Sequence, residues 1–184
     1  MDRYIDIKIQ PDAEMRENVL LNKVITKLHK ALVSLNTNAV GVSFPQYQLK
    51  LGRLLRIHGN SIILNELQTN DWLGGIKGYC HLSETLPIPK LVKYRVISRK
   101  QSNMTQAKLN RLIKRGSISP DEVKAYKAKM FSQSLDNPYL ELESGSNGHK
   151  HRRFIEFGEL LDSPISGNFD TFGLSKDQAT VPWF

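Results

Sequence analysis

Two hydrophobic periodicities alternate along the first half of the chain, and their order restricts the folds open to it. Ile5, Ile7 and Ile9 alternate with polar residues, which is typical of a half-buried strand, and Pro11 ends the pattern. Over residues 15–35 the apolar side chains instead recur at helical spacing. They are Leu21, Val24, Leu28, Leu32 and Leu35. A strand followed by an amphipathic helix is therefore expected.

The same alternation continues to about residue 82. Short strands are expected at 40–44 and 54–58, a helix at 62–67, and a last strand at 79–82 after a glycine-containing turn. The order β-α-β-β-α-β predicts a ferredoxin-like α+β sandwich. We assign residues 1–88 to this first domain.

The second half has a different pattern. The sequence predicts an extended basic segment, two helices with a stop at Gly116 and a capping box at Ser119, and two further strands. Their expected bounds are 94–101, 104–115, 120–130, 139–143 and 152–157. We assign residues 89–184 to a divergent α+β region with a basic helix.

Positive charge is concentrated in one acid-free segment. Residues 85–120 carry nine Lys and Arg and no Asp or Glu, whereas the whole chain has a net charge of +8. The rest of the chain therefore sums to −1. Such a concentration favours a polyanionic partner, with Arg well suited to phosphate. The alternative is a solvated basic face that binds nothing specific.

The helix expected at 104–115 combines a cationic face with an apolar face. Its cations lie on one side at helical spacing: Lys108, Arg111, Lys114 and Arg115. Leu109, Leu112 and Ile113 lie on the other side and are expected to dock the helix on the body. A rigid row of cations suits a phosphate backbone, and an ordinary surface helix would usually include compensating acids.

Arg99 and Gln101 are two residues apart in the extended segment, so their side chains point to the same side. Arg can bind guanine and Gln can bind adenine through two hydrogen bonds each. The major groove of a regular RNA helix is too narrow for such contacts, so they would suit a duplex end. Two solvated side chains on a basic strand are the alternative.

The histidines and the single Cys80 do not form a metal motif. His29, His58, His81, His149 and His151 lack the spacing of zinc ligands. The chain also has no phosphate-binding G-x-x-x-x-G-K-[ST] loop, no G-x-S-x-G motif and no carboxylate cluster for two metals. A nuclease built on this chain would therefore work without a metal or other cofactor. His29 borders the apolar helical stripe, and a packed helix histidine is the alternative interpretation there.

No stretch of about 18 consecutive apolar residues occurs, and the acidic N-terminal residues do not resemble a secretory signal. We therefore expect a cytoplasmic protein without a membrane partner.

Short motifs along nearly the whole chain resemble the type I-F CRISPR repeat-processing endoribonucleases. They are 27–33 (KLHKALV), 41–45 (GVSFP), 94–95 (YR), 98–101 (SRKQ), 144–148 (SGSNG), 152–155 (RRFI), 173–176 (GLSK) and 181–184 (VPWF). Each is weak alone, but their joint order and spacing make the resemblance strong.

The resemblance implies a metal-independent enzyme that cuts precursor CRISPR RNA at the 3′ base of the repeat stem. The ribose 2′-OH would attack the phosphate, leaving a 2′,3′-cyclic phosphate (or 3′-phosphate) and a 5′-OH. His29 matches the catalytic histidine and Ser144 the serine that orients the 2′-OH. Ser146 and Asn147, in the same loop, are assigned to RNA binding.

The resemblance also implies how the RNA is recognised and kept. Arg99 and Gln101 match the residues that read the bottom of the stem, and the helix at 104–115 matches the one inserted in its major groove. The implied partners are the repeat stem-loop, the mature guide RNA and other subunits of a type I-F surveillance complex.

Two positions depart from the family pattern. Phe172 stands where the family often has a tyrosine, so only a positioning role is expected of it, with the ring packed on His29. His151 stands where the family stacks an aromatic ring on the terminal base pair, and an imidazole offers less stacking area.

Three functions compete on these grounds. The first is the endoribonuclease, and the second is a non-catalytic subunit that binds the RNA hairpin and caps the guide RNA. His29 and Ser144 favour the first, while Phe172 leaves room for the second. A DNA-binding regulator is disfavoured because no pair of recognition helices is evident. The sequence does not determine the repeat sequence or the number of turnovers.

Overall fold

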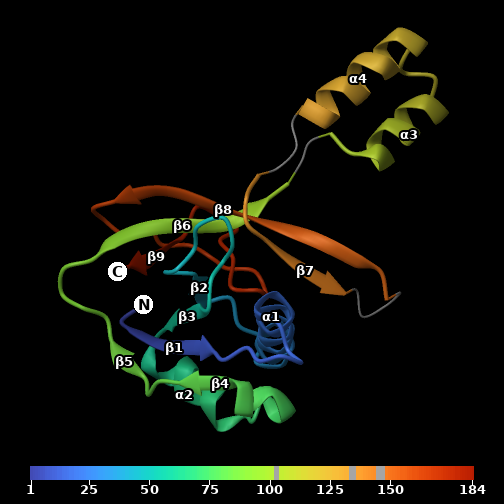
Figure 1. Ribbon diagram of the computed structural model, residues 1–184. Helices are drawn as coiled ribbons and strands as arrows, with labels where there is room; N and C mark the ends of the chain where they lie inside the picture. The colour runs from blue at the N-terminus through green and yellow to red at the C-terminus, as the bar shows by residue number, and fades with distance from the viewer. Residues whose placement is uncertain (102–103, 133–135, 144–147) are drawn as a thin grey trace.

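Residues 1–101, 104–132, 136–143 and 148–184 are described by a computed structural model (Figure 1). The first half contains β1 (Arg3–Ile9), α1 (Glu17–Ser34), β2 (Gly41–Ser43), β3 (Leu54–Gly59), α2 (Ser61–Thr69), the 3-10 helix η1 (Gly74–Tyr79), β4 (Cys80–Leu82) and β5 (Leu86–Pro87). Its strands form an antiparallel sheet in the order β2-β3-β1-β4, and β5 also pairs with β1. This β-α-β-β-α-β arrangement confirms the predicted ferredoxin-like fold.

The second half forms another antiparallel sheet with a helical insertion. Its elements are β6 (Lys93–Lys100), α3 (Gln106–Lys114), α4 (Pro120–Ser132), β7 (Tyr139–Glu143), β8 (Lys150–Leu161) and β9 (Thr180–Trp183). The strands lie in the order β7-β8-β6-β9. The α+β class predicted for this half is confirmed.

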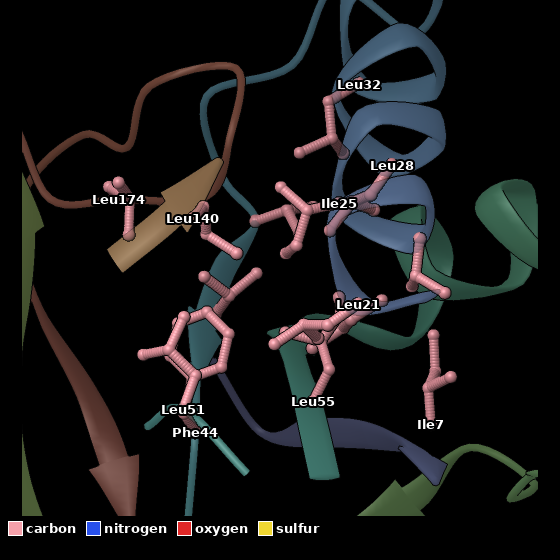
Figure 2. Packing of buried hydrophobic residues seen from close by; sticks show 14 of the residues in the cluster. Ile7, Leu21, Ile25, Leu28, Leu32, Phe44, Leu51, Leu55, Leu140 and Leu174 are labelled. Atoms are coloured by element: carbon pink, nitrogen blue, oxygen red, sulfur yellow. The ribbon is translucent and has the colours of Figure 1, made fainter. Parts of the chain in front are cut away.

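One hydrophobic core joins the two sheets. On α1 the side chains of Leu21, Leu28 and Leu32 are buried at the spacing that the sequence predicted, and Ile25 is buried beside them. Figure 2 shows them facing Leu140 of β7 as well as residues of the first sheet. Leu174, from the segment before β9, belongs to the same cluster. The helix is thus held by apolar surface from both halves.

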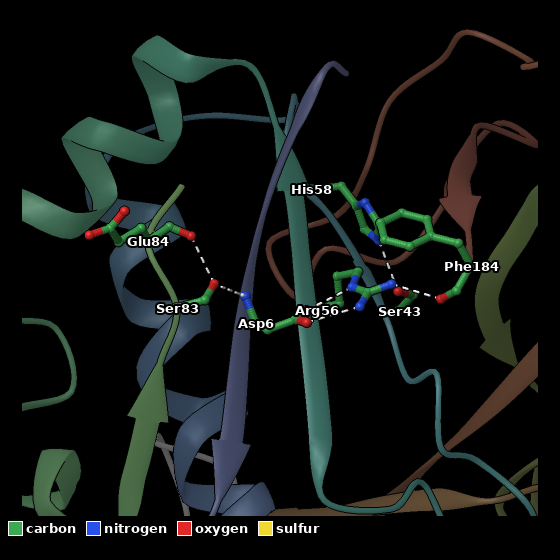
Figure 3. Close-up of polar contacts among 7 residues, drawn as sticks. All are labelled: Asp6, Ser43, Arg56, His58, Ser83, Glu84 and Phe184. Carbon is green, nitrogen blue, oxygen red and sulfur yellow. Dashed lines mark hydrogen bonds and ion pairs between the residues drawn. The ribbon is translucent and has the colours of Figure 1, made fainter. Parts of the chain in front are cut away.

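A buried polar cluster also connects the end of the chain to the first sheet (Figure 3). Arg56 donates hydrogen bonds to both carboxylate oxygens of Asp6, at 2.7 and 2.9 Å, and to the main-chain oxygen of Phe184 at 2.7 Å. Beside it, His58 Nε2 and Ser43 Oγ are 2.8 Å apart. Each charged group here has a partner of opposite sign or a hydrogen bond, as buried charge requires.

The helices α3 and α4 form a hairpin that projects away from both sheets (Figure 1). Thr105 caps α3 by accepting a hydrogen bond from Lys108 N, and Gly116 ends it with a positive φ of 65°. Ser119 and Glu122 exchange hydrogen bonds at the start of α4, which confirms the predicted capping box.

The predicted docking of α3 on the body is wrong. Leu109 is fully buried, but α3 packs mainly on α4, and Ile113 is about half exposed. On α4, the half-buried residues Val123, Tyr126 and Met130 recur at helical spacing. The apolar face of α3 therefore contributes to a small core within the hairpin, because a partner helix follows it directly in the sequence.

One local expectation also differs from the structure. The sequence pattern predicts only an irregular connector at residues 87–89, but Leu86–Pro87 forms the short strand β5 against β1. Proline is tolerated there because β5 lies at an edge.

None of the described helices is long and apolar enough to cross a membrane.

Candidate active site and RNA-facing surface

His29 lies in the last half of α1, next to the buried Leu28 and itself half-buried. Its Nδ1 atom is 3.2 Å from the main-chain oxygen of Thr171. A carbonyl oxygen can only accept, so Nδ1 carries the proton in this contact. The neutral ring then has its lone pair on Nε2, which is the atom available for proton transfer.

Phe172 packs directly on the His29 ring. The two ring centroids are 4.0 Å apart and their planes differ by 5°, which is a stacked arrangement. The expected contact between these residues is therefore present. A phenyl ring fixes the plane of the imidazole but offers no hydrogen bond, so the orientation of His29 depends on this stacking and on the Thr171 carbonyl.

A tight turn at residues 170–174 carries both partners of His29. Asp170 Oδ1 accepts hydrogen bonds from the main-chain N–H groups of Phe172 and Leu174, at 2.8 and 2.9 Å. Gly173 has a positive φ of 74°, and its carbonyl accepts from Val42 N at 2.9 Å. A Cβ atom at Gly173 would lie 2.6 Å from Val42 Cγ1, so only glycine fits here. The turn is thereby fixed to β2.

Arg153, on β8, completes a stack of three side chains. Its Cζ atom lies 3.8 Å from the centre of the Phe172 ring, and its NH1 group bonds Asp170 Oδ2 at 3.0 Å. Burial lowers the pKa of the Arg153 guanidinium; Asp170 acts in the opposite direction, and the positive charge of Arg99 lowers this pKa further. A cation above the ring stabilises the stacked position of Phe172.

Arg99 lies on the same face of the second sheet as Arg153. Arg99 on β6 pairs with the buried Ile155 on β8, and side chains two residues apart on a strand share a face. The electrostatic effect of Arg99 on Arg153 agrees with this placement. Gln101 follows the end of β6 and is exposed. The structure thus brings Arg99 towards the His29 stack.

His151 is exposed near the start of β8, opposite Leu142 of β7. It shares a face with Arg153 by the alternation of the strand. Ser144, Ser146 and Asn147 lie outside the described residues, so their predicted roles stay predictions.

The predicted cations of α3 are all exposed on the side of the helix opposite Leu109. They are Lys108, Arg111, Lys114 and Arg115. Because Leu109 faces α4, these cations point away from the hairpin core. The predicted cationic face is therefore present on a projecting element.

In the described part of the chain, no three His, Cys, Asp or Glu side chains are grouped so that they could hold a metal ion. The chemistry that these residues offer is proton transfer by His29 Nε2 beside a cationic surface.

Three residues of the site were not predicted from the sequence: Asp170, Thr171 and Arg153. Asp170 is followed by Thr-Phe-Gly, and an Asp three residues before a Gly is typical of a tight turn. This pattern predicts the turn at 170–174. Thr171 contributes only a backbone carbonyl, for which a side-chain pattern gives no signal.

Comparison with known proteins agrees with this description over the full chain. Residues 4–184 match the model of the family described as CRISPR-associated protein (Cas_Csy4). Two relatives, both named CRISPR-associated endonuclease Cas6/Csy4, come from Escherichia coli (strain UTI89 / UPEC) and Pseudomonas aeruginosa (strain UCBPP-PA14). Each is 35% identical, over 185 and 188 residues respectively, and each alignment covers 100% of both proteins.

The chain was also aligned with a solved structure of the CRISPR endoribonuclease Cse3 bound to 19 nt RNA. That alignment covers 100% of both chains, with 15% identity and a TM-score of 0.39. The family match and the two full-length relatives establish that the chain belongs to the Cas_Csy4 family of CRISPR-associated proteins.

Proposed function

We propose that the protein is a metal-independent endoribonuclease that cuts precursor CRISPR RNA at the 3′ base of the repeat stem-loop. The observation that carries this proposal is His29, held by the Thr171 carbonyl and the Phe172 ring, in a chain that matches endonuclease relatives along its whole length.

In the proposed reaction the RNA supplies the nucleophile. Nε2 of His29 takes the proton of the ribose 2′-OH, and the 2′ oxygen attacks the adjacent phosphorus as the bond to the 5′ oxygen breaks. A proton returns to that 5′ oxygen, giving a 2′,3′-cyclic phosphate and a 5′-OH. Addition of a water molecule to the cyclic phosphate, with cleavage of its bond to the 2′ oxygen, would give the 3′-phosphate. Ser144 would orient the 2′-OH for in-line attack.

The remaining residues divide between positioning and recognition. Phe172, Arg153 and Asp170 keep the imidazole in its plane, and none of them needs to exchange a proton. Arg99 and Gln101 would read the lowest base pairs of the stem, with His151 stacked on its end. Ser146 and Asn147 would contact the RNA near the cut.

The cationic face of α3 would lie along the stem phosphates, so that the product hairpin stays bound as part of the guide RNA. The protein would then act in the cytoplasm beside other subunits of a type I-F surveillance complex.

A cleavage gel with the cognate repeat hairpin in excess EDTA tests this function. We expect one cut below the stem with wild type, and none with His29→Ala. A 2′-deoxy substitution at the scissile nucleotide should stop the cut while the hairpin still binds, because only the nucleophile is removed. A cut that needs a divalent ion, or that survives His29→Ala, would overturn the mechanism.

Phe172 favours one second candidate, a non-catalytic subunit that caps the guide RNA hairpin. The ring has no hydroxyl group that could take part in proton transfer. Tight hairpin binding without a cut by the wild-type protein would support this candidate.

A further inference from the structure

A large groove lies beside His29 and takes no part in the function proposed above. Its volume is about 880 Å³, and its walls come from three parts of the chain. One wall is the outer side of α1 between Val19 and Ser34, a length of about 22 Å at the rise of an α-helix. The others are the segment from Asn70 to Ile76 and the adjoining ends of β7 and β8.

The groove is rich in unpaired positive charge. Its lysines are Lys23, Lys27, Lys30 and Lys150. None of these four has an ion-pair partner among the residues that the structure describes. They are spaced along the groove rather than gathered at one point, which suits an extended polyanion better than a small anion.

Two of the three acidic residues of the groove form ion pairs with cations that lie outside it. Oδ1 of Asp71 lies 3.9 Å from Nζ of Lys77, and Oε1 of Glu141 lies 3.9 Å from Nε of Arg152. Neither Lys77 nor Arg152 lines the groove. Only Glu143 remains without such a partner in the described chain. The four lysines of the groove thus outnumber its three carboxylates, and two of those carboxylates have ion-pair partners outside the groove.

An aromatic ring and neutral polar groups complete the lining. Trp72 is half-buried against the hydrophobic core and also forms part of the groove wall. Asn22, Thr26 and Asn70 add groups that can form hydrogen bonds. Lysines beside an aromatic ring are the combination that binds single-stranded nucleic acid, with phosphates on the cations and a base stacked on the ring.

The groove adjoins the proposed cutting site along α1. Lys30 follows His29 directly, and Asn22 and Thr26 lie on the turns of α1 below His29. Asn22 Oδ1 accepts a hydrogen bond from Glu141 N at 3.1 Å, which holds the edge of β7 against the helix at this point. A strand that passes the imidazole can therefore continue into the groove.

We propose that this groove binds the single-stranded RNA on the 3′ side of the cut. The inference rests on the proposed endoribonuclease function and assigns a second RNA site to it. Arg99 and His151, which are proposed to contact the stem, share a sheet face with Arg153, and neither of them lines the groove. The strand that leaves His29 on the other side is the one that begins with the scissile phosphate.

The test compares binding of two non-cleavable hairpins, each with a 2′-deoxy scissile nucleotide, that carry one or eight nucleotides 3′ of the cut. We expect wild type to bind the longer RNA about ten-fold more tightly at low salt, with a steeper salt dependence. The double variant Lys23→Gln/Lys30→Gln should lose this difference but bind the short RNA normally. Both lysines are exposed, so the fold is preserved.

A matched control variant tests whether the effect is specific to the groove lysines, and a third RNA tests whether it is specific to the 3′ side. Lys8→Gln/Lys50→Gln removes two exposed lysines outside the groove and should bind both RNAs as wild type does. A hairpin extended by eight nucleotides on the 5′ side should gain nothing from the groove lysines. Equal wild-type affinity for the short and long 3′ RNAs, or a loss that follows the 5′ extension, would overturn the proposal. Cleavage of the unmodified hairpin would still be measured separately, so failure of the enzyme function would be recognised by itself.

Discussion

At the scale of single residues, no carboxylate of the described residues is recorded in direct contact with His29. Its Nδ1 atom meets a main-chain carbonyl, and the nearest acidic group in the network, Asp170, acts through the turn and through Arg153. A neutral carbonyl fixes the tautomer without adding negative charge beside the imidazole. This arrangement suits a site that must also accept an anionic phosphate.

Substitutions of Phe172 separate stacking from hydrogen bonding. Phe172→Ala removes the ring on which His29 and Arg153 both pack, so we expect a loss of at least ten-fold in the single-turnover cutting rate. Phe172→Tyr keeps the ring and should cut within about three-fold of wild type. Rates measured at saturating protein isolate this step from binding. A large gain in rate for the Tyr variant would instead assign the family's tyrosine a role in proton transfer.

His58 should make the fold sensitive to acid. Burial lowers its pKa to about 3, with smaller effects of the same sign from Arg56 and the N-terminal ammonium group. Below pH 6.5 the unfolded chain therefore binds a proton that the folded chain does not, and folding weakens as the pH falls. The expected loss between pH 7 and pH 5 is about 2 kcal/mol.

Urea titrations at both pH values measure this loss. His58→Gln should be less stable at pH 7 but lose less on acidification, and His81→Gln, at an exposed position, should behave as wild type. An equal loss in wild type and His58→Gln would assign the acid sensitivity to other groups.

At the scale of elements, the α3–α4 hairpin separates its two functions by face. The apolar side of α3 is used for the hairpin's own core, which leaves the whole cationic side for a ligand. Because the hairpin stands away from the two sheets, its cations would contribute to the proposed RNA binding at a distance from the His29 stack (Figure 1).

Removing charge from the two helices should therefore have unequal effects. Arg111→Gln/Lys114→Gln on α3 should weaken hairpin binding and lower the slope of log K against log salt by about one unit for each phosphate that the variant no longer neutralises. Lys124→Gln/Lys127→Gln on α4 removes two exposed cations from the neighbouring helix and should leave that slope unchanged. The same reduction in both variants would mean that net charge, rather than the α3 face, determines affinity.

The elements themselves could be predicted well from local patterns. The alternation at Ile5, Ile7 and Ile9 and the helical spacing from Leu21 to Leu32 depend only on neighbouring residues, and they indicate the first strand and helix directly. The partner of α3 could not be predicted in this way, because its apolar face fits α4 or the body equally well. His29 could be singled out only by resemblance, since its partner Thr171 is 142 residues away in sequence.

At the scale of the whole molecule, the two halves assigned as domains share one core. Leu140 and Leu174 pack in the same cluster as Leu28, and Arg56 binds the main-chain oxygen of Phe184 (Figures 2 and 3). Neither sheet can lose its packing without exposing apolar surface of the other. The protein should therefore unfold as one cooperative unit.

The two tryptophans allow this to be measured, because Trp72 lies between α2 and η1 in the first half and Trp183 lies on β9 in the second. Trp183→Phe leaves only Trp72 as a reporter, and Trp72→Phe leaves only Trp183. In each variant the urea midpoint from fluorescence should equal that from far-ultraviolet circular dichroism. A midpoint for either tryptophan that differs from the circular dichroism of the same variant would indicate that the halves unfold independently.

The origin of the His29 stack in distant segments has a consequence for protein synthesis. A growing chain presents His29 early, then the cationic helix α3, and only afterwards Arg153 and the turn at residues 170–174. The groups that orient the imidazole thus leave the ribosome after those proposed to hold the RNA. In the proposed function, capture of a transcript could begin during translation, but its cutting would wait until the turn has been made and docked on β2.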